Sequence, residues 1–192
     1  MNDLSDRPPG PRPPGYPAEL ERDWQAADGT AVRIRPLRPD DLESEIRFIA
    51  GLSEQTLYLR LQYSSREVSR GDAERLLAID YHDTMAIGAL VNGPQGDEIV
   101  GVSRYARIDD SDRAECAIVV TDAWQGRGVG TELIRSLATA ARANGIHTLE
   151  GDSLGENQRI HGWARRFGFD ARTEPNSGGH VHITLDLSSL PS

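Results

Sequence analysis

The residues best suited to chemistry lie in one continuous stretch, residues 113–131. It holds three glycines spaced by two, Gly126, Gly128 and Gly130, which follow an apolar, β-branched run at 117–120. Helical spacing of apolar residues begins directly afterwards, so the order is strand, glycine loop and helix N-terminus. Glycines let a backbone approach a ligand closely, and the first N–H groups of a helix have no internal partner. This stretch is therefore suited to binding an anion such as a phosphate.

The spacing of the glycines separates the loop from two familiar phosphate-binding patterns. No Lys follows the glycines, as the G-x-x-x-x-G-K-[ST] pattern requires, and their even spacing differs from G-x-G-x-x-G. The pattern present is Gln125-x-x-Gly128-x-Gly130, directly after a strand that carries an acidic residue. The alternative interpretation is a glycine-rich turn that merely starts a helix.

Hydrophobic periodicity predicts the elements that must hold this stretch in place. The expected strands are 32–35, 84–91, 98–102 extended by 105–108, 114–120, 147–154, 169–172 and 181–187. The expected helices follow Pro39, Ser53 and the glycine loop, and cover 69–79 and about 157–167. Strands outnumber helices, and both parallel and antiparallel connections are implied, so the sequence predicts a mixed α/β sandwich.

Two details of this prediction can be checked directly. The helix at 69–79 is expected to turn Ala73, Leu76 and Leu77 inward, because they are its apolar residues at helical spacing. The last two strands are expected to form a hairpin closed by the loop Pro175–Gly179, which is rich in turn-forming residues.

The composition restricts the class of protein. A chain of 192 residues is long enough for one sizeable core, and a net charge of −9 argues against nucleic-acid binding, which requires a basic face. The single cysteine, Cys116, cannot form an internal disulfide and fits a reducing compartment. There is no apolar run of about 20 residues and no hydrophobic signal segment at the start. A soluble, cytoplasmic protein without a membrane partner is expected.

The first residues differ in composition from the rest. Residues 1–22 carry six of the 11 prolines and are expected to form a flexible, proline-rich arm, with a single domain at 23–192. A ligand for a proline-recognition module is the alternative interpretation of the arm. The chain has no Lys, so all 21 basic residues are Arg.

Three segments resemble the GNAT superfamily of N-acetyltransferases: 114–131, Gly151–Asn157 and Trp163–Phe169. Further segments resemble its bacterial Pat-type protein lysine acetyltransferases, namely Ile34–Asp41 with Leu52–Arg60, and Ala114–Val120. The resemblance spans about residues 31 to 187. It implies a central, mixed but mostly antiparallel β-sheet flanked by helices on both faces. It also implies acetyl-CoA as the acyl donor and direct transfer to a primary amine. No His/Cys cluster has metal-ligand spacing, so no metal is expected.

The resemblance also implies where acetyl-CoA is held. The pyrophosphate lies on the glycine loop, and the pantetheine arm pairs like a strand with the backbone before it. The implied cofactor-binding residues are Ile118, Val119, Val120, Gln125, Gly126, Arg127, Gly128, Val129, Gly130, Thr131 and Asn157. Arg127 could reach a phosphate or remain a solvated loop residue, and Asn157 could bind the pantetheine arm or only cap its helix.

Glu115 matches the acidic position that acts as general base in the Pat-type subgroup. A base is needed because a lysine amine, with a pKa of about 10.4, is almost entirely protonated at pH 7 and cannot attack a thioester. A nearby carboxylate can take that proton, directly or through water. Alternatively, Glu115 is a solvent-facing strand residue paired with Arg113 or Arg104, in which case Glu150 and Asp152 are the fallback acids.

The leaving thiolate has no obvious proton donor. Many family members carry a Tyr five residues before the Phe of the final Gly-Phe pair, and Ala164 stands at that position here. His161 lies four residues after Asn157 on the same helix face and could donate a proton, or could be an ordinary surface or packing residue. A thiolate is also a tolerable leaving group without an acid. Cys116 should face away from Glu115, which argues against an acetyl-cysteine intermediate.

The favoured function is therefore acetyl-CoA-dependent acetylation of lysine side chains in proteins. The same chemistry on a small amine is the first alternative, because the sequence does not show how deep the acceptor groove is. A non-catalytic acyl-CoA-sensing module is the second. The expected partners are acetyl-CoA and either a protein lysine or a small amine, while the oligomeric state is not predicted.

Overall fold

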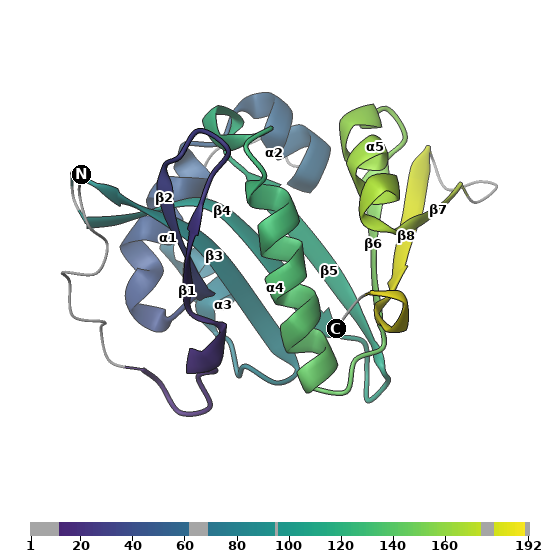
Figure 1. Ribbon diagram of the computed structural model, residues 1–192, viewed down its shortest axis with the longest axis horizontal. Coiled ribbons are helices and arrows are strands. Elements are labelled where there is room, and N and C mark those ends of the chain that lie inside the picture. The colour runs from purple at the N-terminus through teal and green to yellow at the C-terminus, as the bar shows by residue number, and fades with distance from the viewer. Residues whose placement is uncertain (1–11, 62–68, 95, 174–178, 191–192) are drawn as a thin grey trace.

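A single eight-stranded sheet organises the computed structural model, which describes residues 12–61, 69–94, 96–173 and 179–190 (Figure 1). Its order is β1-β2-β3-β4-β5-β6-β8-β7, and every neighbouring pair is antiparallel except β5 and β6, which are parallel. The strands are β1 (Arg22–Gln25), β2 (Ala31–Pro36), β3 (Thr84–Gly93), β4 (Gly96–Arg107), β5 (Arg113–Val120), β6 (Thr148–Leu154), β7 (Asp170–Thr173) and β8 (His180–Asp186).

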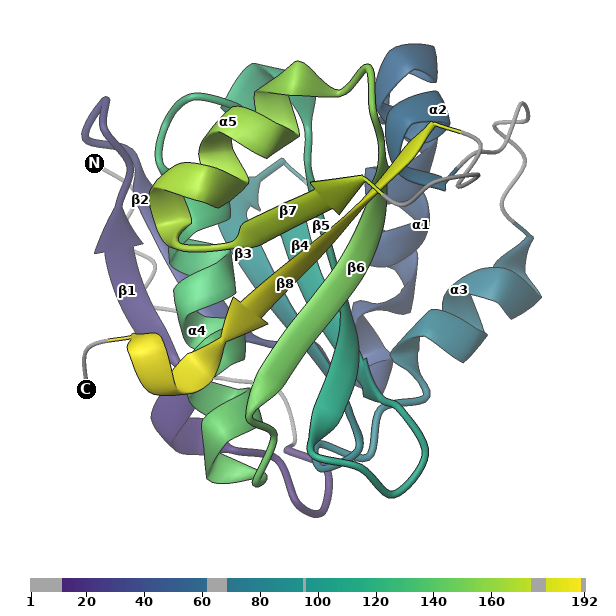
Figure 2. The ribbon, with the colours of Figure 1, turned by 90° about the vertical axis from the view of Figure 1, so that its right-hand side faces the viewer.

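Helices cover both faces of the sheet, as predicted. One face carries α4 (Val129–Ala143) and α5 (Gln158–Phe167), and the other carries α1 (Leu42–Ala50), α2 (Glu54–Leu61) and α3 (Arg70–Leu77) (Figures 1 and 2). Each face has its own apolar core. Among the described helices, none has the length and apolar character needed to cross a membrane.

The glycine loop leads into α4, the helix that packs across the centre of the sheet. Leu133, Ile134 and Leu137 are at most 1% exposed, because their spacing places them on the side that meets the strands. Gly128 adopts a left-handed conformation with φ of +92° immediately before the helix, which a residue with a side chain rarely adopts. Gly145, also left-handed, follows the C-terminal Asn144. The predicted order of strand, glycine loop and helix is confirmed.

The strands β5 and β6 pair over only part of their length. Their parallel register joins residues 113–115 of β5 to residues 148–150 of β6 and then stops. From Cys116 to Val120, β5 remains paired with β4, but no described strand pairs with its other edge. At the first residue after the paired part, a Cβ on Gly151 would lie 2.7 Å from the Cys116 carbonyl oxygen. The two strands therefore pair over three residues, approach closely at Gly151 and Cys116, and then separate.

The N-terminal part departs from the prediction. Strand β1 was not predicted, and the segment before it packs on the domain, because the Tyr16 ring lies edge-on against Tyr81 at 5.5 Å. Within the segment, Arg12 pairs with Glu21 at 2.9 Å. Leu20 also contacts the core. The expected boundary at residue 22 thus falls inside a packed segment, because aromatic and ionic contacts hold residues that proline excludes from helices and central strands. Residues 1–11 of the expected arm lie outside the described residues.

Two further expectations concern the helix α3 and the last hairpin. Leu76 was expected to face inward but is 40% exposed, because α3 is short and Ala73 and Leu77, four residues apart, occupy its buried side. The hairpin of β7 and β8 is confirmed by their antiparallel register. Its predicted loop, Pro175–Gly179, lies outside the described residues except for Gly179.

Candidate active site

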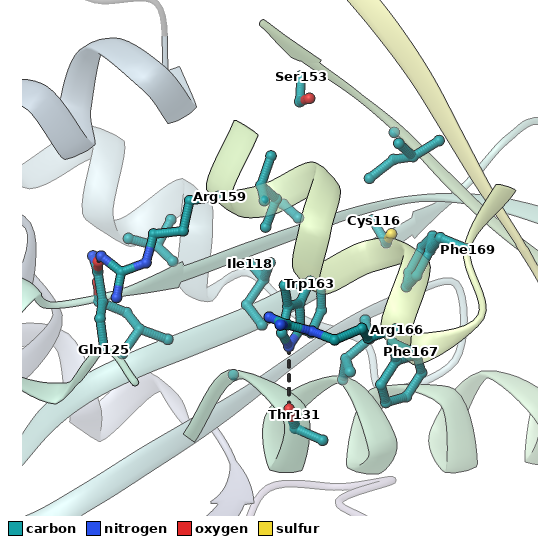
Figure 3. A pocket seen from close by; sticks show the side chains of 18 of the residues that line it. Cys116, Ile118, Gln125, Thr131, Ser153, Arg159, Trp163, Arg166, Phe167 and Phe169 are labelled. Carbon is teal, nitrogen blue, oxygen red and sulfur yellow. Dashed lines mark hydrogen bonds between the residues drawn. The ribbon is translucent and has the colours of Figure 1, made fainter. Parts of the chain in front are cut away.

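A cavity of about 980 Å³ opens where β5 and β6 separate. Its walls are residues 116–120 of β5, Gly151, Asp152 and Ser153 of β6, and the facing sides of α4 and α5 (Figure 3). Trp163 of α5 reaches across and donates a hydrogen bond from its ring nitrogen to the Thr131 hydroxyl at 3.1 Å. The cavity thus lies between β5 and α4 on one side and β6 and α5 on the other. The two sides are joined where β5 and β6 pair.

The glycine loop closes one end of this cavity. Gly126 and Gly128 are both left-handed, with φ of +78° and +92°, and both line the cavity together with Gln125. The Gln125 side chain donates to the Val120 carbonyl at 2.9 Å. The loop therefore presents backbone and the N-terminus of α4 to the cavity, an arrangement that favours phosphate groups.

The hairpin of β1 and β2 holds the outside of the loop. The Ala27 N–H donates to the Arg127 carbonyl at 3.2 Å, and the Arg127 guanidinium pairs with Asp28. The same guanidinium lies 4.9 Å from the ring of Trp124. A Cβ on Gly128 would lie 3.3 Å from the ring of Trp24. In the described structure, Arg127 is held by the hairpin and does not line the cavity.

The structure brings most of the predicted cofactor-binding residues together. Those that line the cavity are Ile118, Val119, Val120, Gln125, Gly126, Gly128, Gly130, Thr131 and Asn157. Val129 is fully buried and, like Arg127, is not part of the lining, so it can contribute only its backbone at the helix N-terminus. The Asn157 side-chain oxygen, Oδ1, caps α5 by accepting from the Ile160 N–H at 3.2 Å. Asn157 therefore serves as a cap and also faces the cavity.

Four arginines that were not predicted line the same cavity. Arg135 and Arg142 lie seven residues apart on α4, and Arg159 and Arg166 lie seven apart on α5, so each pair shares one face of its helix. This spacing was the signal in the sequence. Arg159 already reaches the loop and donates to the Gln125 side-chain oxygen (Figure 3). The lining of the cavity of this acidic protein thus carries four arginines beside the two acids Asp122 and Asp152.

Glu115 lies at the last paired position of β5 and faces away from the cavity. Its neighbours Ala114 and Cys116 contact the core under α4, and Cys116 lines the cavity, so alternation directs Glu115 to the opposite face. Glu115 is exposed, and its carboxylate forms no hydrogen bond or ion pair within the described chain. The predicted opposite orientation of Glu115 and Cys116 is confirmed.

The arginines considered as partners of Glu115 are paired with other acids. Arg113 donates to Glu150 through two nitrogens, at 2.9 and 2.5 Å. Arg104 pairs with the buried Glu45 of α1, where burial raises the pKa of Glu45 against the opposing effect of the Arg104 charge. The other fallback acid, Asp152, lies 3.0 Å from His182. Among the three candidate bases Glu115, Glu150 and Asp152, Glu115 is thus the one whose carboxylate is unpaired within the described part of the chain.

On the cavity side, His161 and Ser153 form a buried pair. The His161 Nε2 lies 2.6 Å from the Ser153 Oγ, and the two residues are 4% and 8% exposed. Burial, with the nearby charge of Arg165, lowers the pKa of His161. Ala164 is fully buried. Sequence reasoning considered His161 but missed Ser153, although alternation along β6 places Ser153 on the helix-covered face with the buried Leu149.

The described residues contain no cluster of three or more His, Cys, Asp or Glu side chains that could hold a metal ion. The site consists of the strand edge, the glycine loop, the arginines and the acids already named. Together they provide an anion-binding cavity on one face of the sheet and a free carboxylate on the other.

Comparison with known proteins identifies this arrangement. The family model described as "Acetyltransferase (GNAT) family" matches residues 54–169. The acetyltransferase PA5475 of Pseudomonas aeruginosa is 34% identical over 160 residues, which cover 83% of this chain and 86% of that protein. The acetyltransferase Pat of Mycolicibacterium smegmatis is 32% identical over 149 residues, or 75% of this chain, but this chain matches only 43% of the length of Pat.

Solved structures of acetyltransferases also resemble this chain. The GNAT domain of S. lividans PAT superposes with a TM-score of 0.82 at 30% identity, covering 89% of this chain and 99% of that one. The PaiA N-acetyltransferase from Thermoplasma acidophilum, solved in complex with coenzyme A, shares the fold with a TM-score of 0.67 at 16% identity, covering 81% and 98%. The chain is an acetyltransferase, and it belongs to the GNAT family, whose members use acetyl-CoA.

Proposed function

We propose that this enzyme transfers the acetyl group of acetyl-CoA directly to the side-chain amine of lysine in proteins, with Glu115 as the general base. The observation that carries the proposal is the position of Glu115. It occupies the last paired residue before β5 and β6 separate, on the face opposite the cavity, with an unpaired and exposed carboxylate in the described chain. An acyl group held between the strands would thus meet an amine that arrives from the side of Glu115.

The cavity supplies what acetyl-CoA needs. The pyrophosphate fits the glycine loop and the N-terminus of α4, and the arginines of α4 and α5 supply charge for its phosphates. The pantetheine amides can pair with the free edge of Ile118, Val119 and Val120, because amide groups continue a strand's hydrogen-bonding pattern. Arg127 can reach a phosphate only by leaving Asp28 and Trp124.

The acid–base step follows from the two faces of the sheet. A lysine ammonium, with a pKa of about 10.4, must lose a proton before its nitrogen can attack the thioester carbon. Glu115 accepts that proton, directly or through water, and returns it to solvent because its carboxylate is exposed. Its lack of a charged partner in the described chain leaves both oxygens available.

A protein acceptor is favoured by the open surface next to Glu115. On that face, Asp152 of β6, His182 of β8 and Arg172 of β7 lie in register across neighbouring strands. Asp152 and Arg172 are exposed, and His182 is partly exposed. Tyr58 of α2, on the helix-covered part of the same face, is 53% exposed, a large apolar surface that a bound polypeptide can cover. The similarity to Pat-type acetyltransferases points in the same direction.

The test is release of free CoA from acetyl-CoA in the presence of lysine peptides, denatured proteins or small amines. We expect release with peptides or proteins, and a fall in kcat of about 10²–10⁴-fold in Glu115→Gln. Glu150→Gln is the matched control, because Glu150 lies beside Glu115 in register but is held by Arg113. It should retain most of the activity.

Each other outcome has a defined meaning. Release of CoA with small amines alone would show that the acceptor is a small amine and not a lysine of a protein. Binding of acetyl-CoA without turnover of any amine would favour a sensing module. Full activity of Glu115→Gln would refute the base assignment and direct attention to Glu150 and Asp152.

A further inference from the structure

The buried pair of Ser153 and His161 has no role in the chemistry described so far. Ser153 lies on the cavity side of β6, two residues beyond the point of closest approach at Gly151, and lines the space into which the pantetheine arm fits. His161 comes from α5 and is not part of the lining, so it reaches the cavity only through the Ser153 hydroxyl. Burying a hydroxyl and an imidazole is unfavourable unless both are hydrogen-bonded.

The hydrogen-bonding capacity of the pair determines what it can offer to the cavity. A serine hydroxyl has one proton and two acceptor positions, and a neutral imidazole has one N–H. If the His161 Nε2 carries that hydrogen, it donates to the Ser153 Oγ, and the hydroxyl proton is left free to point into the cavity. The lowered pKa of His161, caused by burial and by Arg165, keeps the ring neutral, as this arrangement requires.

We propose that the Ser153 hydroxyl, oriented by His161, donates a hydrogen bond to the sulfur of CoA as the carbon–sulfur bond breaks. This inference rests on the proposed function in one respect, namely that the thioester lies between β5 and β6. The new bond joins the amine nitrogen to the carbonyl carbon, and the electron pair of the broken bond moves to sulfur. The nitrogen proton leaves through Glu115 to solvent. The thiolate takes a proton from water, and Ser153 keeps its own.

Stabilising the thiolate is effective at this position because the Ser153 and His161 side chains are buried. A hydrogen bond to a charged group in a buried environment is stronger than one to a neutral group in water. The sulfur gains its charge only as the bond breaks, so the donor favours the transition state over the bound substrate. Ser153 is thus assigned as a catalytic residue, and His161 as the residue that positions it.

The first test measures the sulfur directly and needs no acceptor. CoA is bound to the protein in a Cys116→Ser background, which leaves the CoA thiol as the single thiol, and its thiolate absorbance is followed against pH. We expect Ser153→Ala to raise the pKa of the bound CoA thiol by about 1–2 pH units, whereas Ser153→Thr should keep it near that of the parent. Ser103→Ala is the matched control, because Ser103 is a buried strand serine bonded to the Leu133 carbonyl and does not line the cavity.

Other charges also act on this sulfur, but they are the same in every variant. The charged residues of the cavity lining are Arg135, Arg142, Arg159, Arg166, Asp122 and Asp152. Glu115 lies beyond the paired end of the strands, and Arg165 lies near His161. Because only the hydroxyl changes between the parent and Ser153→Ala, the difference between the two titrations belongs to that hydroxyl.

The second test is kinetic and separates chemistry from binding. Ser153→Ala should lower kcat about tenfold to hundredfold while the KM for acetyl-CoA changes by less than about threefold. His161→Leu should lower kcat in the same way, and the double variant should be no slower than Ser153→Ala, because His161 acts through Ser153. Nitrogen NMR of His161 should show the proton on Nε2.

The outcomes distinguish this inference from the proposed function. An unchanged thiol pKa in Ser153→Ala would refute it even if kcat fell, since a purely structural pair affects folding and not the sulfur. A nitrogen NMR spectrum with the Nε2 of His161 unprotonated would also refute it. A raised thiol pKa without turnover of any lysine substrate would support the role of Ser153 while the protein-acetylation proposal failed. Failure of CoA to bind at all would overturn both.

Discussion

Replacing Gly151 with Ala tests why β5 and β6 separate at the position where Glu115 lies. The added Cβ would be 2.7 Å from the Cys116 carbonyl oxygen, about 0.7 Å short of ordinary van der Waals contact. That oxygen belongs to the backbone of β5 and cannot rotate away, so the strand itself must move. Overpacking of this kind costs about 1–3 kcal/mol. For a chain of this length, the melting temperature should fall by about 2–12 °C.

The same substitution should also slow catalysis. Glu115 is the residue next to Cys116, so a shift of β5 displaces the base from the thioester. A misplacement of about 1 Å can cost about 100-fold in rate, and we expect kcat to fall about tenfold to hundredfold in Gly151→Ala. Thermal unfolding and CoA release at saturating acetyl-CoA measure the two effects.

A second glycine provides the control for this experiment. A Cβ on Gly162 of α5 would meet nothing within 4 Å, and Gly162→Ala should stabilise the helix by about 0.5–1 kcal/mol without loss of activity. Gly151→Ala with the melting temperature and kcat of the parent would show that the close approach does not set the separation of the strands. The inference that this close approach fixes the position of Glu115 would then be wrong.

Three further predictions concern the donor loop, the arginines and pH. Gly128→Ala should destabilise the protein by about 1–2 kcal/mol and weaken acetyl-CoA binding measured by calorimetry, because φ is +92° and Trp24 lies against the added Cβ; unchanged binding would contradict this. Arg159→Ala should raise the KM for acetyl-CoA about tenfold with little change in kcat, and the difference should shrink as salt is added; a salt-independent difference would contradict the charge argument. Burial and Arg165 lower the pKa of His161, so the unfolded chain takes up the proton first, and stability should be lost as pH falls below about 6.5. His161→Leu should flatten that slope in denaturant titrations at several pH values, and an unchanged slope would show that another group is responsible.

Much of the fold could be predicted because its signals are local. The alternation in β8 and the glycine loop before α4 each lie within a short stretch, and both are confirmed. Strand β1 could not be predicted, since Arg22–Gln25 has no apolar alternation and forms by pairing with β2 at the edge of the sheet. Its signal lies in the partner strand and not in its own residues.

The site shows the same division. The glycine loop is recognisable in sequence because its residues follow one another, and Glu115 is expected from the resemblance to the Pat-type subgroup. The pairing of Arg113 with Glu150 instead depends on the parallel register of β5 and β6. The bond between Ser153 and His161 likewise depends on how α5 lies over β6. Contacts of this kind arise from tertiary packing, and they decide which acid is left free and which hydroxyl faces the cavity.

The attachment of the glycine loop to the β1–β2 hairpin has a consequence for donor affinity. The Ala27 N–H, the Asp28 carboxylate and the Trp24 ring hold Arg127 and Gly128 from outside. A loop that is already ordered loses less conformational entropy when a ligand binds, so part of the affinity for acetyl-CoA arises from residues that never touch it. The exchange rate of the Ala27 amide hydrogen reports how often this attachment opens, and it should slow further when the donor is bound.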